Sequence, residues 1–310
     1  MLRAGDLVAF PTETVYGLGA DASNAAAVGK VFAAKGRPAD HPLIVHLPDA
    51  GHLERWAIEI PQAARRLAAA FWPGPLTLIL KRHPAVIDAI TGGQDTVGLR
   101  VPRHPLALQL LREFAGGVAA PSANRFGHVS PTTAAHVRDE LGAAVGMVLD
   151  GGPCQVGIES TILDLSSGMP RILRPGMLDA MALAEVLGEV PAFGAEGAVP
   201  RVSGSLESHY APTTPMRLLP ADAIAPAIDL ALGRGQRVVV FAPASPGRRE
   251  SNLIWREASR DPGAYAHELY ARLREFDALG GDLILVAAPP VDEAWRGVND
   301  RLQRAAAEVK

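Results

Sequence analysis

The chain has 310 residues, a length that suggests about two domains, and 48% of them are hydrophobic, enough for real cores. No apolar run approaches the ~20 residues of a membrane-spanning helix, and the start shows no basic segment followed by an apolar one, so neither a membrane span nor a secretory signal peptide is expected. The net charge of −3 argues against a general nucleic-acid binder, and the single cysteine, Cys154, excludes an internal disulfide framework and fits the reducing cytoplasm.

The first predicted strand is the apolar run Leu7–Phe10, which Pro11 ends because proline has no N–H to donate to a neighbouring strand. Residues 11–22 then carry hydroxyl side chains and glycines, and we interpret them as a loop that leads to a helix beginning near Asn24. Hydroxyls and glycines between a strand and a helix are typical of a small-molecule site, although a plain polar turn has the same composition.

The helix is predicted to run to about Ala34 and to end at Lys35-Gly36-Arg37-Pro38. A cation, a glycine and a proline in this order are ordinary helix-stop signals, so Lys35 and Arg37 could simply end the helix. The next predicted strand is 42–47, in which Ile44 and His46 share one face.

The stretch Thr96–Val101 is predicted to form a strand with two different faces. Alternation sends Val97, Leu99 and Val101 to the core and leaves Thr96, Gly98 and Arg100 on the opposite face. A glycine between a hydroxyl and a guanidinium leaves room for a ligand above the sheet; a solvated sheet face is the alternative.

The rest of the first part continues as an alternation of helices and strands. Predicted elements are a helix at 62–71, a rigid turn at 72–75, and strands at 76–80, 117–120, 147–149, 160–165 and 171–173. Ser130-Pro131-Thr132 is predicted to begin a further helix, whose N-terminus could bind phosphate.

The periodic pattern is lost from about Ala192 to Pro215, where Gly, Ser and Pro surround Ser208-His209-Tyr210-Ala211-Pro212. We interpret this region as an interdomain linker. After it the pattern predicts helices at 221–232 and 264–279, strands at 237–241 and 283–287, and a terminal helix from about Asp300. This alternation indicates a small Rossmann-like α/β domain.

Several common motifs fail on inspection. Gly17–Ala22 matches the relaxed dinucleotide fingerprint, but Pro11–Tyr16 separate it from the strand that the fingerprint requires. A phosphate-binding P-loop fails because Asn24 stands where its first glycine should be. The histidines show no zinc-like spacing, and Cys154 fits a structural thiol better than a nucleophile.

Separated motifs along the chain resemble those of the YrdC-like family in its long form, the threonylcarbamoyl-AMP synthases. They are Pro11-Thr12-Glu13-Thr14-Val15-Tyr16-Gly17-Leu18-Gly19, Lys35-Gly36-Arg37-Pro38, Ser122-Ala123-Asn124, Ser208-His209-Tyr210-Ala211-Pro212, Phe276-Asp277-Ala278-Leu279-Gly280 and Val298-Asn299-Asp300-Arg301-Leu302. The resemblance covers nearly the whole chain, with His41 a departure where Asn is commoner. It implies an α/β fold: a YrdC-like twisted mixed sheet with helices and a concave ligand groove (1–195), a linker over the active site (196–215) and a smaller Rossmann-like α/β domain (216–310).

The family's reaction gives the expected function. It joins L-threonine, bicarbonate or CO2, and ATP into L-threonylcarbamoyl-AMP and releases pyrophosphate, which makes the chain a nucleotidyltransferase. The product is expected to pass to a tRNA threonylcarbamoyl transferase complex that modifies an adenosine next to the anticodon, and a weak contact with tRNA is a further expectation. Mg²⁺ is expected with the triphosphate, without a metal site built by the protein.

The resemblance also assigns site residues. The catalytic residues would be Lys35, Arg37, Ser122 and Asn124. ATP would be bound by Arg37, His41, Thr96, Ser122, Ser130, Arg174 and Tyr210. Threonine would be bound by Thr14, His46, Arg100, Ala120 and Ser160. Glu13 is the nearest acidic candidate for a metal, and a structural role for it is equally open.

Two other functions stay open. A carbamoyl-transfer module of a hydrogenase-maturation protein normally comes with zinc-finger and acylphosphatase domains, which this chain lacks. A non-enzymatic RNA-binding or ribosome-maturation factor could use the same groove, but the net charge of −3 disfavours it.

Overall fold

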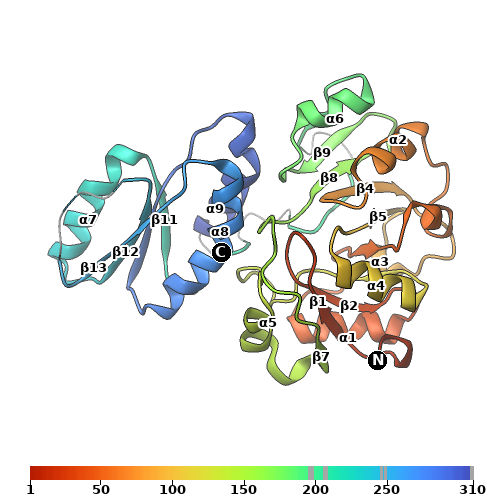
Figure 1. Ribbon diagram of the computed structural model, residues 1–310, viewed down its shortest axis with the longest axis horizontal. Coiled ribbons are helices and arrows are strands. Elements are labelled where there is room, and N and C mark those ends of the chain that lie inside the picture. Colours follow the sequence, from red (N-terminus) through yellow and green to blue (C-terminus); the bar gives the residue numbers. More distant parts are fainter. Residues whose placement is uncertain (195–198, 205–208, 245–246, 248–249, 308–310) are drawn as a thin grey trace. The chain divides into compact units, whose positions relative to one another are not determined.

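The computed structural model describes residues 1–194, 199–204, 209–244, 247 and 250–307 (Figure 1). The chain divides into two compact units, residues 1–126 with 130–205 and residues 127–129 with 206–310. The division falls after residue 205, so the described residues 199–204 of the predicted linker belong to the first unit. Residues 196–198 and 205–208 of that linker, including Ser208, lie outside the described residues. No helix among the described residues is long and apolar enough to cross a membrane.

The first unit, which we call the catalytic unit because the sequence predicts the active site in it, is built on a twisted ten-stranded mixed sheet with the order β10-β9-β8-β4-β5-β3-β6-β2-β1-β7. Its strands are β1 (Val8–Phe10), β2 (Gly17–Asp21), β3 (Ile44–His46), β4 (Leu76–Lys81), β5 (Thr96–Arg100), β6 (Val118–Ala119), β7 (Met147–Val148), β8 (Thr161–Asp164), β9 (Arg171–Arg174) and β10 (Ala192–Phe193). Its helices are α1 (Ala25–Lys35), α2 (Gln62–Phe71), α3 (Asp88–Thr91), α4 (Pro105–Phe114), α5 (Ala134–Leu141) and α6 (Ala180–Leu187), with short 3-10 turns at Leu2–Ala4, Ala50–Arg55 and Gly142–Ala144. The predicted α/β class with a large mixed sheet is confirmed.

The prediction of a loop across residues 11–22 is wrong for its second half, which forms β2. This strand pairs antiparallel with β1, and Gly19 lies opposite Val8. A Cβ atom on Gly19 would lie 2.8 Å from the ring of Phe10 and 3.0 Å from the carbonyl oxygen of Val8. Gly19 therefore allows close packing against β1, a contact between strands that its turn-forming tendency hides in the sequence.

The predicted helix start at Ser130-Pro131-Thr132 is also wrong, because α5 begins at Ala134. Thr133 is its N-cap, and its hydroxyl accepts a hydrogen bond from the backbone N–H of His136 at 3.2 Å. Helices α4 and α6 were not predicted from the sequence. Helix α4 is capped by the Nδ1 atom of His104, a residue that is seldom read as a cap.

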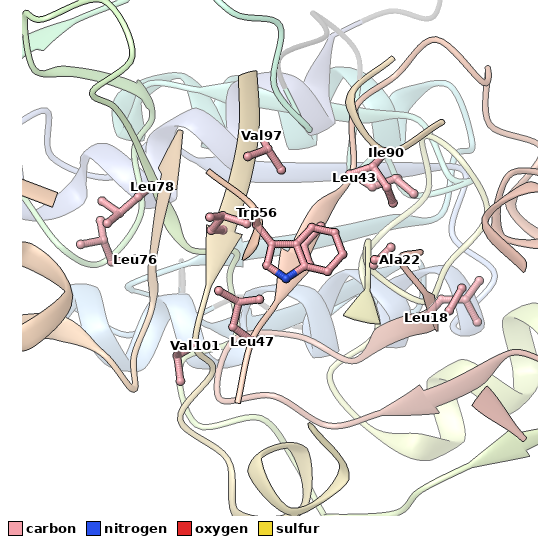
Figure 2. Close-up of a cluster of buried hydrophobic side chains, with 14 of the residues drawn as sticks. Leu18, Ala22, Leu43, Leu47, Trp56, Leu76, Leu78, Ile90, Val97 and Val101 are labelled. Atoms are coloured by element: carbon pink, nitrogen blue, oxygen red, sulfur yellow. The ribbon is translucent and has the colours of Figure 1, made fainter. Parts of the chain in front are cut away.

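The predicted alternation of β3 and β5 is confirmed, and it divides the sheet into two faces. Leu43, Leu47, Val97 and Val101 lie in the large core shown in Figure 2, together with Trp56. The other face carries a small apolar cluster of Ile44, Ile79, Ile162, Leu173 and Val202. Because side chains alternate, the polar residues of β3 and β5 lie on this second face.

The second unit, the C-terminal unit, has a four-stranded sheet in which every pair is parallel. Its strands, in sheet order, are β11 (Met216–Leu219), β14 (Leu283–Ala287), β12 (Val238–Ala242) and β13 (Leu253–Glu257), and its helices are α7 (Ile224–Gly233), α8 (Pro262–Ala278) and α9 (Arg296–Ala306), with 3-10 turns at Ala221–Ala223 and Glu293–Trp295. Helix α7 packs on one face through Ile224 and Ile228. On the other face, Phe241 of β12 contacts Tyr265 and Phe276 of α8. The predicted Rossmann-like domain is confirmed, with two strands more than predicted and a terminal helix that begins at Arg296.

Gly19 and Gly29 offer a matched test of this packing. Gly19→Ala should lower the free energy of unfolding by about 1–3 kcal/mol, because its new methyl group meets Phe10 and the backbone of β1. Gly29→Ala, on the exposed side of α1 with nothing within 4 Å, should raise it by about 0.5–1 kcal/mol. Urea unfolding of both variants checks this, and equal effects would contradict the proposed role of Gly19.

Candidate active site

The candidate site lies on the second face of the catalytic sheet. Strands β3 and β5 run parallel, with Ile44 opposite Gly98 and His46 opposite Arg100. Residues 201–203, which we call the 201–203 segment, line the groove over Gly98 and leave about 10 Å³ of free volume there. A wider cavity of about 560 Å³ adjoins Thr96 and is lined by Lys81, Gly93, Gln94, Asp95, Ser166, Ser167, Val199 and Pro200. The space that a glycine at position 98 opens above the sheet is thus filled by the chain itself near Gly98.

Arg100 is held by an acidic partner from the first loop. Its Nη2 atom lies 2.8 Å from Oε1 of Glu13, with 5% and 0% of the two side chains exposed. Its Nε donates to the carbonyl oxygen of Gly74, and Oε2 of Glu13 accepts the backbone N–H of Arg103. Both carboxylate oxygens of Glu13 are therefore engaged, and Glu13 has a structural role. An incoming carboxylate would share Arg100 with Glu13.

Lys35 both ends a helix and reaches residues 122–130, which we call the site loop. Gly36 follows α1 in the left-handed conformation (φ 60°), as the stop signals predict. The buried ammonium of Lys35 donates to the carbonyl oxygens of Ser122 and Asn124, the latter at 2.6 Å. Burial, and after it the charge of Arg37, holds the pKa of Lys35 well below its usual value. Lys35 can therefore belong to the helix-stop signal and to the candidate site at the same time.

Arg37 and Arg174 meet at Ser203. Nη2 of Arg37 donates to the hydroxyl of Ser203 at 3.1 Å and to the carbonyl oxygen of Pro42 at 2.9 Å. Nη1 of Arg174 donates to the carbonyl oxygen of Ser203 at 2.9 Å. Nη2 of Arg174 also donates to the hydroxyl of Ser160, which lies 2.8 Å from that of Thr77 on β4. The 201–203 segment thus brings together two arginines that are 137 positions apart in the printed sequence.

The same segment is fixed at its other end. The backbone N–H of Arg201 donates to Oε1 of Gln94 at 2.6 Å, and its guanidinium donates to the carbonyl oxygen of Gly92 at 3.0 Å. Between these ends, Val202 is buried against Ile79 and Ile162. Polar and apolar contacts together hold the 201–203 segment over the sheet.

Two loops carry the predicted hydroxyl groups. The backbone N–H of Tyr16 donates to the carbonyl oxygen of Pro131, so the loop around Thr14 is bonded to the loop that contains Ser130. The hydroxyl of Thr12 donates to the carbonyl oxygen of Val15, so the buried hydroxyl of Thr14 must donate to Thr12 at 2.9 Å. The backbone N–H of Ala120, at the end of β6, donates to the carbonyl oxygen of Ile44.

Sequence reasoning missed two residues of this site, Glu159 and Ser203. Oε1 of Glu159 accepts a hydrogen bond from the hydroxyl of the fully buried Ser130 at 2.6 Å. Glu159 directly precedes Ser160, a predicted threonine-binding residue, and this position is the only sign in the sequence that Glu159 belongs to the site. Ser203 stands in a segment that reads as featureless linker, and nothing local indicates its two arginine contacts.

The two predicted site histidines differ in environment. His46 is buried with its ring edge-on to Phe10, and burial, with the charge of Arg100 adding to it, lowers the pKa of His46 to about 3. His46 is therefore neutral near pH 7. His41 is half-buried with its ring centroid 5.3 Å from that of Phe126, and burial lowers its pKa more modestly.

Tyr210 belongs to the C-terminal unit. Its ring centroid lies 5.7 Å from that of Tyr270, and the guanidinium of Arg301 lies 5.4 Å from its centre. These contacts anchor Tyr210 in the C-terminal unit. Its predicted contact with ATP stays a prediction.

A large mixed sheet with helices, together with a smaller unit built on a parallel sheet, defines an α/β protein of the YrdC-like class. Residues 1–176 match the family model Sua5_yciO_yrdC, described as telomere recombination, and residues 178–307 match the model described as the C-terminal domain of threonylcarbamoyl-AMP synthase. The threonylcarbamoyl-AMP synthase of Pyrococcus abyssi is 40% identical, over 98% of this chain and 91% of the relative. That of Bacillus subtilis is 39% identical, over 99% and 91%.

Solved structures agree with these relatives. The crystal structure of P. abyssi Sua5 complexed with L-threonine superposes with a TM-score of 0.90 at 38% identity, covering 98% of this chain and 92% of the other. A P. abyssi Sua5 variant with a His and the following Tyr both changed to Ala gives 0.90 at 37% identity, covering 98% and 90%. The chain belongs to the threonylcarbamoyl-AMP synthase family and is an enzyme, and the predicted family is confirmed.

The pair of Arg100 and Glu13 should behave as a buried unit. Arg100→Met alone should lower the free energy of unfolding by about 3–5 kcal/mol, because it leaves the Glu13 carboxylate buried without its counter-charge. Adding Glu13→Gln should recover much of that loss. Lys81→Met, which removes the exposed ion pair with Glu59, is the control and should cost less than about 1 kcal/mol. Denaturant unfolding measures these free energies. If the loss in the Arg100→Met, Glu13→Gln double variant equals the sum of the losses in the two single variants, the two side chains are not a coupled pair.

His46 should make the protein acid-sensitive. Because its pKa is lowered to about 3 in the folded state from 6.5, the unfolded state binds more protons between these values, so stability falls as the pH drops below 6.5. At pH 5 the loss due to His46 should reach about 2 kcal/mol. His46→Gln should flatten the unfolding free energy between pH 7 and 5, whereas replacing the exposed His267 with Gln should not. Parallel profiles for wild type and His46→Gln would refute the assignment.

Proposed function

We propose that this enzyme makes L-threonylcarbamoyl-AMP from L-threonine, bicarbonate or CO2, and ATP, with release of pyrophosphate. The observation that carries the proposal is the group of buried cations, Lys35, Arg37 and Arg174, whose hydrogen bonds described above go to neutral oxygen atoms. Phosphate oxygens accept stronger, charge-assisted hydrogen bonds from the same donors. The names of the relatives and the threonine complex of P. abyssi Sua5 support the same substrates.

The residues divide the substrates between two parts of the site. Lys35 and Arg37 would hold the β- and γ-phosphates near the loop of Ser122 and Asn124, and Arg174 would hold the α-phosphate. Threonine would lie over β3 and β5, its carboxylate on Arg100, with neutral His46 and Ser160 beside it and Thr14 and Ala120 closing the pocket. Thr96 and His41 would face the nucleotide, next to the cavity of about 560 Å³.

The reaction needs little covalent help from the protein. An oxygen of the threonine carbamate attacks the α-phosphorus, the bond from that phosphorus to the α,β-bridging oxygen breaks, and pyrophosphate leaves with the electron pair. Alignment of the carbamate with the leaving group and neutralisation of the leaving charge by Lys35 and Arg37 would supply most of the rate. A neutral His46 would let the carbamate approach without adding a further positive charge that traps it.

Mg²⁺ would come with the triphosphate. Among the described residues no three His, Cys, Asp or Glu side chains gather into a metal site, and both oxygens of Glu13 are occupied by Arg100 and the Arg103 N–H. The donors present therefore fit a magnesium ion bound mainly through phosphate oxygens and water. Such an ion would neutralise charge on the leaving pyrophosphate.

The 201–203 segment supports the predicted linker over the active site. To bind phosphates, Arg37 and Arg174 would release the hydroxyl and carbonyl oxygens of Ser203, and Val202 would leave the groove over Gly98. Re-closing over bound substrates would exclude water and protect the labile carbamate.

The product would then pass to a tRNA threonylcarbamoyl transferase complex, for modification of adenosine next to the anticodon.

Lys35 and Arg37 give the direct test. Lys35→Ala and Arg37→Ala should each lower threonine-dependent pyrophosphate release about ten- to a hundred-fold, since each removes roughly 1.5–3 kcal/mol of charged hydrogen bonding to phosphate. Lys30→Ala, which removes an exposed cation from the same helix, is the control and should leave the rate unchanged. A folded double variant of Lys35 and Arg37 that keeps near-normal release would end the proposal.

A further inference from the structure

Three residues of the site loop group with the C-terminal unit. That unit consists of residues 127–129 and 206–310, whereas Phe126 and Ser130 on either side belong to the catalytic unit. Asn124, predicted to be catalytic, and Ser130, predicted to bind ATP, therefore flank a stretch of chain that groups with the C-terminal unit.

Two donors of the C-terminal unit take hold of this stretch through its backbone. The N–H of Ala211 donates to the carbonyl oxygen of Gly127 at 2.9 Å, and His128 forms a parallel β-bridge with Ala211. The guanidinium of Arg274, on α8, donates to the carbonyl oxygen of Val129. Because these bonds involve main-chain carbonyls, they fix the path of the loop whatever side chains it carries.

The donor at Ala211 is itself firmly anchored. Tyr210 adopts a left-handed conformation (φ 61°), unusual for a residue with a side chain, while its ring packs on Tyr270 and Arg301. Just beyond, the backbone N–H groups of Thr213 and Thr214 donate to the carboxylate of Asp277 at 2.9 and 2.8 Å. The left-handed turn at Tyr210 thus sets the direction of the Ala211 N–H, and the surrounding contacts hold the turn in place.

The ends of the same loop are fixed within the catalytic unit. The N–H of Phe126 donates to the carbonyl oxygen of Lys35, and the ammonium of Lys35 donates to the carbonyl oxygen of Asn124. At the other end, the hydroxyl of Ser130 donates to Glu159. Between them stands Gly127 at φ 84°, a left-handed conformation that glycine adopts readily.

We propose that the C-terminal unit sets the affinity of the enzyme for ATP by holding residues 127–129, with Arg274 as a positioning residue for Ser130 and Asn124. The inference rests on the proposed function for the identity of the ligand. It gives the C-terminal unit a role in ground-state binding of the nucleotide. The threonine end of the site, on β3 and β5, lies on other elements and should respond little.

The experiment compares two arginines of α8 in the full-length chain. Arg274→Ala removes the donor to Val129, whereas Arg272→Ala, the control, removes a side chain that pairs with Glu268 and Glu275 of the same helix. Arg274→Ala should raise KM for ATP about tenfold, in line with the cost of small misplacements in a site, and leave KM for threonine within about twofold. Arg274→Lys, which keeps a cationic donor, should recover most of the loss, and Arg272→Ala should behave like wild type.

Deuterium exchange supplies a readout that is independent of activity. Peptides covering residues 124–132 should exchange faster in Arg274→Ala than in wild type, and at the wild-type rate in Arg272→Ala. Unchanged exchange in Arg274→Ala would show that Arg274 does not hold residues 127–129. Faster exchange with an unchanged KM for ATP would show that this contact plays no part in ATP binding. A wild-type chain that releases no pyrophosphate with threonine would instead refute the proposed function. The exchange data would still test whether Arg274 holds residues 127–129.

Discussion

The catalytic unit depends on one constraint: four cationic side chains are buried within it. Lys35, Arg37, Arg100 and Arg174 expose only 3–8% of their surface. A buried charge costs several kcal/mol unless it is paired or fully hydrogen-bonded, so the surrounding loops must supply partners. The site loop at 122–124 turns its carbonyl oxygens toward Lys35, and the 201–203 segment lies where it can serve both Arg37 and Arg174.

The kind of partner separates permanent from exchangeable contacts. Arg100 has a carboxylate partner in Glu13, which is itself bound to the backbone at Arg103, so this pair is part of the fold. Arg37 and Arg174 donate to the hydroxyl and carbonyl oxygens of Ser203, which a phosphate can replace at a gain, because hydrogen bonds to charged groups are worth about 1.5–3 kcal/mol against about 0.5–1.5 for neutral ones. The hydroxyl and carbonyl oxygens of Ser203 thus occupy the places that phosphate oxygens would take on the two arginines.

The sequence revealed what depends on local pattern. Alternation along 96–101 placed Val97 and Arg100 on opposite faces, and the stop signals at Lys35 and Gly36 ended α1 correctly. It could not reveal contacts made across the fold. Position 19 lies in β2, where the Phe10 ring leaves no room for a side chain, and Thr133 rather than Ser130 caps α5. The partners of Arg100, Ser130 and Arg174 lie 87, 29 and 29 positions away, so neither spacing nor propensity could indicate them.

The central claim is that ATP takes the place of Ser203 on two arginines. A crystal structure of the chain with L-threonine and a non-hydrolysable ATP analogue tests it most directly. The account predicts phosphate oxygens within hydrogen-bond distance of Arg37 and Arg174, the Ser203 contacts to both broken, and the Arg100–Glu13 pair intact. A nucleotide bound elsewhere while Ser203 keeps both arginines would contradict it.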